Sequence, residues 1–169
     1  VANPDVNQYG LFGLEESPHG GYFLVSIQAS GLILVVDAPL IDEEAEQAEV
    51  ELILAIPGLS RDASSLYYED GILWVVTSKD QGLFKISTAN PAVEVQTWYD
   101  LSDLPINDPE GFVIYQDVAV FADDSGDQVL RYDNFPACLA NNECQETWRF
   151  EFEKKVEPSG LAWDEARQQ

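Results

Sequence analysis

Basic residues are scarce in this chain. Its 169 residues include 8 Lys and Arg against 31 Asp and Glu, which gives a formal net charge of −23 and a pI of about 4.1. Nucleic acids and anionic membrane surfaces are bound largely through Lys and Arg side chains that neutralise phosphate groups. We therefore expect this chain to bind neither nucleic acid nor an anionic membrane surface.

Several other residues and motifs are missing. The sequence has no Met, a single histidine (His19), and no apolar run that reaches the roughly 18 residues needed to span a bilayer. It also lacks Gly-x-Ser-x-Gly, His-Glu-x-x-His and Gly-x-x-x-x-Gly-Lys-[Ser/Thr]. These absences argue against membrane insertion and against serine-hydrolase, zinc-protease and P-loop chemistry. Because no Met and no n-region with an apolar h-region precede Val1, we expect a mature or processed segment, and removal of a signal peptide is one route to it.

Cysteine is limited to Cys138 and Cys144, which lie in a polar loop. A disulfide between them would close a small loop, which stabilises a fold less than a long-range bridge does, and it would indicate an oxidising compartment. Two unpaired surface thiols are the alternative. A zinc site is a weaker interpretation because His19 is distant in sequence. The pair favours a disulfide and an extracellular or periplasmic location.

The remaining composition is that of a folded protein. Hydrophobic residues make up 46% of the chain and aromatic residues 11%, including 4 Trp. A disordered chain of similar charge would be poorer in both classes. By length alone, the chain corresponds to one domain.

A short motif recurs three times along the chain. Each copy has an acid, a small residue or Pro, then Ser or Glu, a small residue, and a large apolar residue. The copies occupy residues 62–66, 108–112 and 157–161, so they are spaced by 46 and 49 residues. Strand-like runs follow, several of which alternate apolar with polar residues as half-buried antiparallel strands do. The expected fourth strands of the units cover residues 50–56, 92–98 and 147–152.

Four short strands per unit, repeated at this spacing, are typical of β-propeller blades. We predict an all-β fold in which residues 1–169 form one partial propeller domain of four-stranded antiparallel blades. The blades are expected at about residues 10–58, 59–106 and 107–155, with the first strand of a further blade (159–163) within residues 156–169. Trp74, Trp98, Trp148 and Trp163 fall in strands and are expected in the core between blades.

Three blades are fewer than the 4 to 8 of typical propeller rings. The expected partner is therefore the remainder of a larger propeller. The alternative is another copy of this chain, with two or more copies completing one ring.

The motif segments resemble a known family. Residues 62–78, 108–113, 120–126 and 129–133 are similar to the phytase-like β-propellers and to their relatives, bacterial secreted propellers known as SdiA-regulated or "esterase-like activity of phytase". The resemblance implies a secreted propeller with acidic calcium ligands around its channel. Glu110 and either Asp123 or Asp124 match acidic positions of the family, whereas the Asp-Asp-Pro-Ala-Ile-Trp motif of true phytases is missing.

Several acids recur where blades begin. In a propeller the first strand of each blade lines the channel, so we expect Asp62, Asp108, Glu110 and Glu157 at one channel mouth. Clustered carboxylates repel one another unless they are protonated or neutralised, and Ca²⁺ takes 6–8 oxygen ligands. We hypothesise a calcium site formed by these acids. Alternatively, they bond nearby backbone N–H groups in turns.

The acidic loop 122–127 is a second candidate for calcium, through Asp123 and Asp124. It does not match the EF-hand pattern, and a tight turn between strands is the alternative. With this charge, a small anionic ligand is expected only through a bound metal. The sequence thus favours a secreted, calcium-stabilised binding or structural module of a larger extracellular protein or assembly. The alternative is a metal-dependent phytase-like phosphoester or ester hydrolase whose other catalytic residues lie outside this segment.

Overall fold

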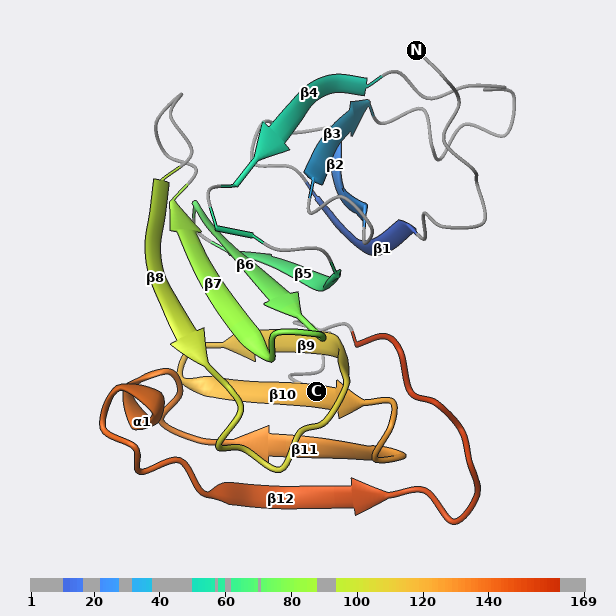
Figure 1. Cartoon of the computed structure of the whole chain (residues 1–169), viewed down its shortest axis with the longest axis vertical. Coiled ribbons are helices and arrows are strands. Elements are labelled where there is room, and N and C mark those ends of the chain that lie inside the picture. The colour runs from blue at the N-terminus through green and yellow to red at the C-terminus, as the bar shows by residue number, and fades with distance from the viewer. Residues whose placement is uncertain are drawn as a thin grey trace.

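The structure, a computed structural model, describes residues 11–16, 22–27, 32–37, 50–56, 58–59, 62–69, 71–87 and 94–161. These residues form three four-stranded antiparallel sheets, each a meander in chain order (Figure 1). The first sheet contains β1 (Leu11–Glu16), β2 (Tyr22–Ile27), β3 (Leu32–Asp37) and β4 (Val50–Ala55). The second contains β5 (Ala63–Glu69), β6 (Ile72–Thr77), β7 (Gly82–Ser87) and β8 (Glu94–Asp100). The third contains β9 (Pro109–Tyr115), β10 (Val118–Asp123), β11 (Gln128–Tyr132) and β12 (Glu146–Glu151).

The sheets are arranged as successive propeller blades. The first strands are neighbours, since β5 contacts both β1 and β9, while the later strands of each sheet lie progressively farther out (Figure 1). Two buried clusters fill the spaces between sheets. One contains Ile33 with Leu73 and Ile86, and the other joins Trp74 and Leu83 to the third sheet. The predicted all-β architecture of four-stranded antiparallel blades is confirmed.

Phe112 is at the centre of the cluster between the second and third sheets. Its ring is 1% exposed and has its centroid 4.9 Å from that of Phe121 and 6.4 Å from those of Tyr67 and Trp74. Full burial of an aromatic side chain contributes about 1.5–3 kcal/mol relative to leaving it exposed. Packing of this kind fixes the position of β9 against the second sheet.

Hydrogen bonds repeat from sheet to sheet. Ser78 N–H donates to the carbonyl of Asp62 at 3.1 Å, and Asp124 N–H donates to that of Asp108 at 3.0 Å. Farther along each turn, Leu101 N–H donates to Gln81 O at 2.8 Å and Phe152 N–H donates to Asp127 O at 2.9 Å. The two acceptors, Gln81 and Asp127, are 46 residues apart. The second and third sheets are therefore structural repeats in register with the sequence motif.

The inner strands of these two sheets are also tied directly. The Ser64 hydroxyl donates to the carbonyl of Pro109, and Ser65 Oγ accepts the Phe112 N–H at 3.0 Å. Because β5 and β9 belong to different sheets, these bonds hold the starts of the two sheets beside each other.

Some expectations about individual residues were wrong. Trp74 is buried as predicted, but Trp98 and Trp148 are 49% and 50% exposed because they lie on the outermost strands, β8 and β12. Residues 159–161 contain no strand, and the rest of the expected strand, including Trp163, lies outside the described residues. His19 also lies outside them.

The loop before β12 contains both cysteines. Part of it forms a single helical turn, α1 (Ala137–Ala140), and Cys138 is disulfide-bonded to Cys144 across a Cα–Cα distance of 4.6 Å. The Asn142 N–H donates to the Leu139 carbonyl, and the Glu143 N–H to the Cys138 carbonyl, so the loop is also closed through its backbone. The predicted cysteine pairing agrees with this geometry. α1 is far too short to cross a membrane, and none of the residues described here forms a helix that could.

Candidate cation-binding site

An open pocket of about 490 Å³ lies where the second and third sheets begin. It combines residues that precede or begin β5 and β9 with residues from the turns after β6 and β10. Its lining is almost entirely polar: Asp62, Ser78, Lys79, Gln81, Asn107, Asp108, Glu110 and Ser125. Three acids that the sequence predicts together therefore share one pocket.

Glu110 is the most perturbed of these acids. It lies in β9, is partly buried, and its Oε2 atom is shielded from solvent without a hydrogen-bond partner. Burial raises the pKa of Glu110 to about 7, and the negative charges of Asp108, Asp124 and Asp62 add to that effect. Near neutral pH this carboxyl therefore holds a proton about half of the time.

Asp124 is the second acid with a buried oxygen that lacks a hydrogen-bond partner. It follows β10, and its Oδ1 atom is buried without a hydrogen-bond partner. Its pKa is raised by burial and then by the charges of Glu157 and Asp108, which the nearby Lys155 partly offsets. Asp124 thus connects the pocket acids electrostatically with Glu157.

Glu157 lies at the rim of this group. Its side chain is 55% exposed and pairs with Lys155, while its backbone N–H donates to Asp127 Oδ1 at 3.2 Å. It does not line the pocket. The structure therefore brings Glu157 close enough to influence Asp124, but not into the cavity.

Asp62 and Asp108 hold equivalent places before the two inner strands. Asp62 has a φ of 84°, a left-handed conformation that is uncommon for a residue with a side chain. Asp108 uses one carboxylate oxygen, Oδ2, to accept a hydrogen bond from the Ser125 hydroxyl at 3.1 Å. The backbone carbonyl of each residue accepts a hydrogen bond just before an inner strand begins. The side chain of each residue lines the pocket.

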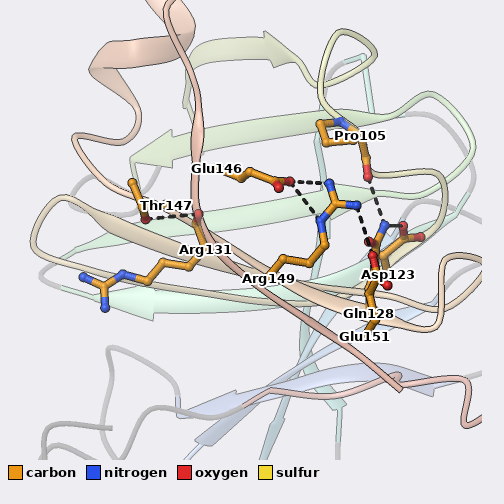
Figure 2. Close-up of polar contacts among 8 residues, drawn as sticks. All are labelled: Pro105, Asp123, Gln128, Arg131, Glu146, Thr147, Arg149 and Glu151. Atoms are coloured by element: carbon orange, nitrogen blue, oxygen red, sulfur yellow. Dashed lines mark hydrogen bonds and ion pairs between the residues drawn. The ribbon is translucent and has the colours of Figure 1, made fainter. Parts of the chain in front are cut away.

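Asp123 is placed differently from the other predicted acids. It is fully buried, and its two oxygens accept hydrogen bonds from the Asp108 N–H at 2.9 Å and from Gln128 Nε2 at 2.7 Å. Gln128 also donates to the carbonyl of Pro105, as Figure 2 shows. Asp123 therefore holds the segment before β9 that carries Asp108, and its oxygens are already engaged.

Ser78, Lys79 and Ser125 also line the pocket, and the motif analysis did not single them out. Ser78 could have been found from the repeat, because it lies 46 residues before Asp124. Within the described ranges, no three His, Cys, Asp or Glu side chains converge closely enough to hold a metal ion as they stand. The carboxylates would have to move toward one another to share a cation.

Solved structures similar to this chain are β-propellers. Glutaminyl cyclase from Myxococcus xanthus matches with a TM-score of 0.57 and 14% identity, over 89% of this chain and 55% of that one. Virginiamycin B lyase from Staphylococcus aureus matches with a TM-score of 0.55 and 15% identity, over 95% and 46%. The β-propeller domain of Cps50 (Swd1) from Myceliophteria thermophila matches with a TM-score of 0.53 and 9% identity, over 95% and 49%.

At these identities the likeness shows the fold alone: the chain has the β-propeller fold. It spans about half the length of these three structures. No family model matches the chain, and no curated protein matches it in sequence. The resemblance to phytase-like propellers therefore remains a prediction.

Proposed function

We propose that this chain is a β-propeller binding module whose acidic pocket takes a divalent cation, with Ca²⁺ the candidate that its oxygen ligands favour. Glu110 would be the central ligand, with Asp62, Asp108 and Asp124 around it. The observation that carries the proposal is the shielded Oε2 of Glu110, which lacks a hydrogen-bond partner and is surrounded by three other carboxylates. A cation would supply the missing interaction and neutralise the repulsion.

The repeat indicates that the fold does not need an acid at the positions of Glu110 and Asp124. At the equivalent positions of the second sheet, Ser64 stands in place of Glu110 and Ser78 in place of Asp124. Ser64 is 1% exposed, and its hydroxyl bonds to backbone carbonyls. Since a small neutral residue serves the blade in one repeat, the incompletely bonded acids of the other favour a role in binding.

The chemistry of the pocket fits a hard cation. Asp62, Asp108 and Glu110 offer carboxylate oxygens, and Ser78, Ser125 and Asn107 add neutral oxygens from the pocket wall. Asp124 does not line the pocket, but its charge acts on Glu110. Ca²⁺ accepts 6–8 such ligands in a flexible geometry and commonly retains water among them. An open pocket allows the side chains to close around the ion.

Isothermal titration calorimetry of chelator-treated protein with CaCl₂ tests this function. The native chain is expected to show saturable binding, and Glu110→Gln is expected to weaken it at least roughly tenfold, because a partly buried charged ligand is lost. Glu143→Gln is the matched control, since Glu143 is an exposed acid of the disulfide loop and does not line the pocket. Absence of binding at millimolar Ca²⁺, or equal affinity in the Glu110 variant, would contradict the proposal.

A second candidate function is calcium-dependent hydrolysis of a phosphoester, as the resemblance to phytase-like propellers implies. One observation favours it: Lys79 lines the same pocket as Glu110, whose pKa of about 7 suits proton transfer near neutrality. Release of phosphate from phytate, measured with and without Ca²⁺, tests this activity. Binding of Ca²⁺ without any phosphate release would leave the binding module as the better description.

The setting that we infer for this module is secreted, either extracellular or periplasmic. The support is the disulfide between Cys138 and Cys144, a bond that persists mainly in oxidising compartments. Mass spectrometry of alkylated, unreduced protein from its native source tests the inference. Alkylation of both cysteines would contradict it.

A further inference from the structure

The third sheet has one covered face and one open face. Cross-strand partners share a face, and the register aligns Val113, Val120, Arg131 and Trp148 across the sheet. In the neighbouring row, Ala122, Val129 and Phe150 are aligned. We call the apolar members the open face: Val113, Val120, Ala122, Val129, Trp148 and Phe150.

Exposure on the open face increases from the inner strand outward. Val113 on β9 is 5% exposed, whereas Trp148 and Phe150 on β12 are 50% and 47% exposed, and their rings stack with centroids 6.2 Å apart. The inner end is crossed by the chain itself, because a Cβ on Gly111 would lie 3.1 Å from backbone atoms of Gly160 and Leu161. On β12, the neighbouring aromatic side chains of Trp148 and Phe150 are therefore about half exposed to solvent.

The equivalent face of the second sheet is buried. Counting 46 residues back from Val113, Val120 and Val129 gives Tyr67, Trp74 and Leu83. All three lie in the cluster that packs against Phe112 and its neighbours on the third sheet, and none is more than 8% exposed. In the second sheet, which the third sheet follows, this face is therefore an interface between sheets.

The sequence of the first sheet suits this interface. β2 and β3 are apolar at nearly every position, a pattern typical of strands covered on both faces. The second sheet covers one face, where Ile33 packs with Leu73 and Ile86. The repeat order of the sheets assigns the other face to a preceding sheet.

We propose that the open face binds the first sheet of a second copy of this chain, so that two copies close one six-bladed ring. Each copy would place its third sheet on the first sheet of the other, which gives two identical contacts about a twofold axis. One chain spans 38–55% of the matched propeller structures, so two chains together match about three quarters or more of such a ring. Six blades also lie within the usual range of 4 to 8 for closed rings.

Charge determines how this assembly responds to salt. Each copy carries a formal charge of −23, so two copies repel each other at low ionic strength. The open face itself contributes apolar side chains, and Arg131 is the charged residue aligned with them in the register. Raising sodium chloride from about 0.1 M to about 1 M shortens the screening length from about 10 Å to about 3 Å. Added salt should therefore strengthen the dimer.

Light scattering coupled to size-exclusion chromatography of the 169-residue chain tests the proposal. The expected mass is twice the 18.8 kDa of one chain, with a larger dimer fraction at high salt. The double variant Trp148→Lys with Phe150→Lys is expected to be monomeric and folded, because both side chains are half exposed. Trp98→Lys is the matched control, since Trp98 is 49% exposed on β8 and aligns with Phe84, which packs toward the first sheet.

Each other outcome would overturn the proposal. A native chain that is monomeric at both salt concentrations would show that the open face does not bind a second copy. A mass of three or more chains would exclude a closed ring of two. A double variant that remains dimeric, with native far-UV circular dichroism, would show that the contact lies elsewhere.

Discussion

The second and third sheets form equivalent turns with different side chains. After β6, the Thr77 hydroxyl bonds to the backbone of Gly82, accepting its N–H at 3.2 Å. After β10, the same positions hold Asp123 and Gln128, which bond to each other at 2.7 Å. Two equivalent turns are thus supported by different residues, a neutral pair in the second sheet and an acid with an amide in the third. The fold can therefore be built without acids here, and the acids of the third sheet fall into two kinds.

The first kind is structural, and Asp123 is the example: both its oxygens are engaged by donors. The second kind includes Glu110 and Asp124, whose shielded oxygens have no donor. Acids of the first kind stabilise the third sheet, whereas those of the second kind reduce its stability unless a proton or a cation reaches them.

The largest effect is expected for Asp123→Ala. The change leaves the Asp108 N–H and the Gln128 amide without their acceptor in a buried place, which should lower the free energy of unfolding by about 3 kcal/mol. Urea denaturation measures it. Replacing Asp123 by Thr together with Gln128→Gly copies the second-sheet turn and should restore much of the loss. If the copied turn is no better than the alanine variant, the two turns are not equivalent.

A smaller loss is expected from opening the disulfide. Replacing both Cys138 and Cys144 by Ser should cost roughly 2 kcal/mol, because the loop that the bond closes is short. The control is native protein kept reduced, which should show the same loss in urea. An unchanged free energy of unfolding in both samples would show that the backbone bonds of α1 suffice to hold the loop.

Glu110→Gln should stabilise the calcium-free protein. The pKa of Glu110 is raised from 4.5 to about 7 on folding, so the folded state binds the extra proton between these values. Stability is then lost as the pH rises from 4.5 to about 7. Above pH 7 the variant should be more stable by about 1–2 kcal/mol, after discounting for solvent screening of a half-exposed group.

Urea denaturation of native and variant protein at a series of pH values checks this difference. Glu143→Gln again serves as the control and should follow the native profile. Parallel profiles for native protein and Glu110→Gln across the whole window would mean that Glu110 has an ordinary pKa.

The smallest effect is expected for Asp124→Ser, which introduces the residue of the second sheet. The raised pKa of Asp124 means that its charge is unfavourable in the folded state. Because the residue is partly exposed, removing the charge should stabilise calcium-free protein by less than about 1 kcal/mol at pH 8. The same variant should bind Ca²⁺ more weakly in calorimetry. A loss of stability without Ca²⁺ would place Asp124 with Asp123 as a structural acid.

Much of the fold was predictable because the repeat of four-stranded sheets corresponds to a repeat of the sequence motif. The acid-led motif at residues 62 and 108 predicted the inner strands, and the hydrogen bonds repeat at the same spacing of 46 residues. Trp98 and Trp148 lie in the expected fourth strands, but their exposure was not predictable in this way. A strand pattern gives the two faces of a strand but not how far a neighbouring sheet covers them, and the outermost strands leave even large side chains exposed.

The candidate site was predictable in part for a related reason. Repeat spacing indicated that Asp62, Asp108 and Glu110 gather in one place, since equivalent residues of adjacent blades lie side by side. It could not separate Asp123 from Asp124, because that difference depends on which backbone and amide donors face each carboxylate. The preceding repeat has Ser64 at the position of Glu110. This difference is the sequence signal that Glu110 is a surplus acid, that is, an acid that the blade does not need for its fold.

The most direct test of the central claim, that the third sheet carries surplus acids that accept a cation, is the pKa of the Glu110 carboxyl itself. Carbon NMR titration of glutamate-labelled protein, assigned with Glu110→Gln, measures it with and without Ca²⁺. The structure predicts a pKa of about 7 in calcium-free protein, and a marked fall when Ca²⁺ is added. An ordinary value near 4.5, unaffected by Ca²⁺, would contradict the account.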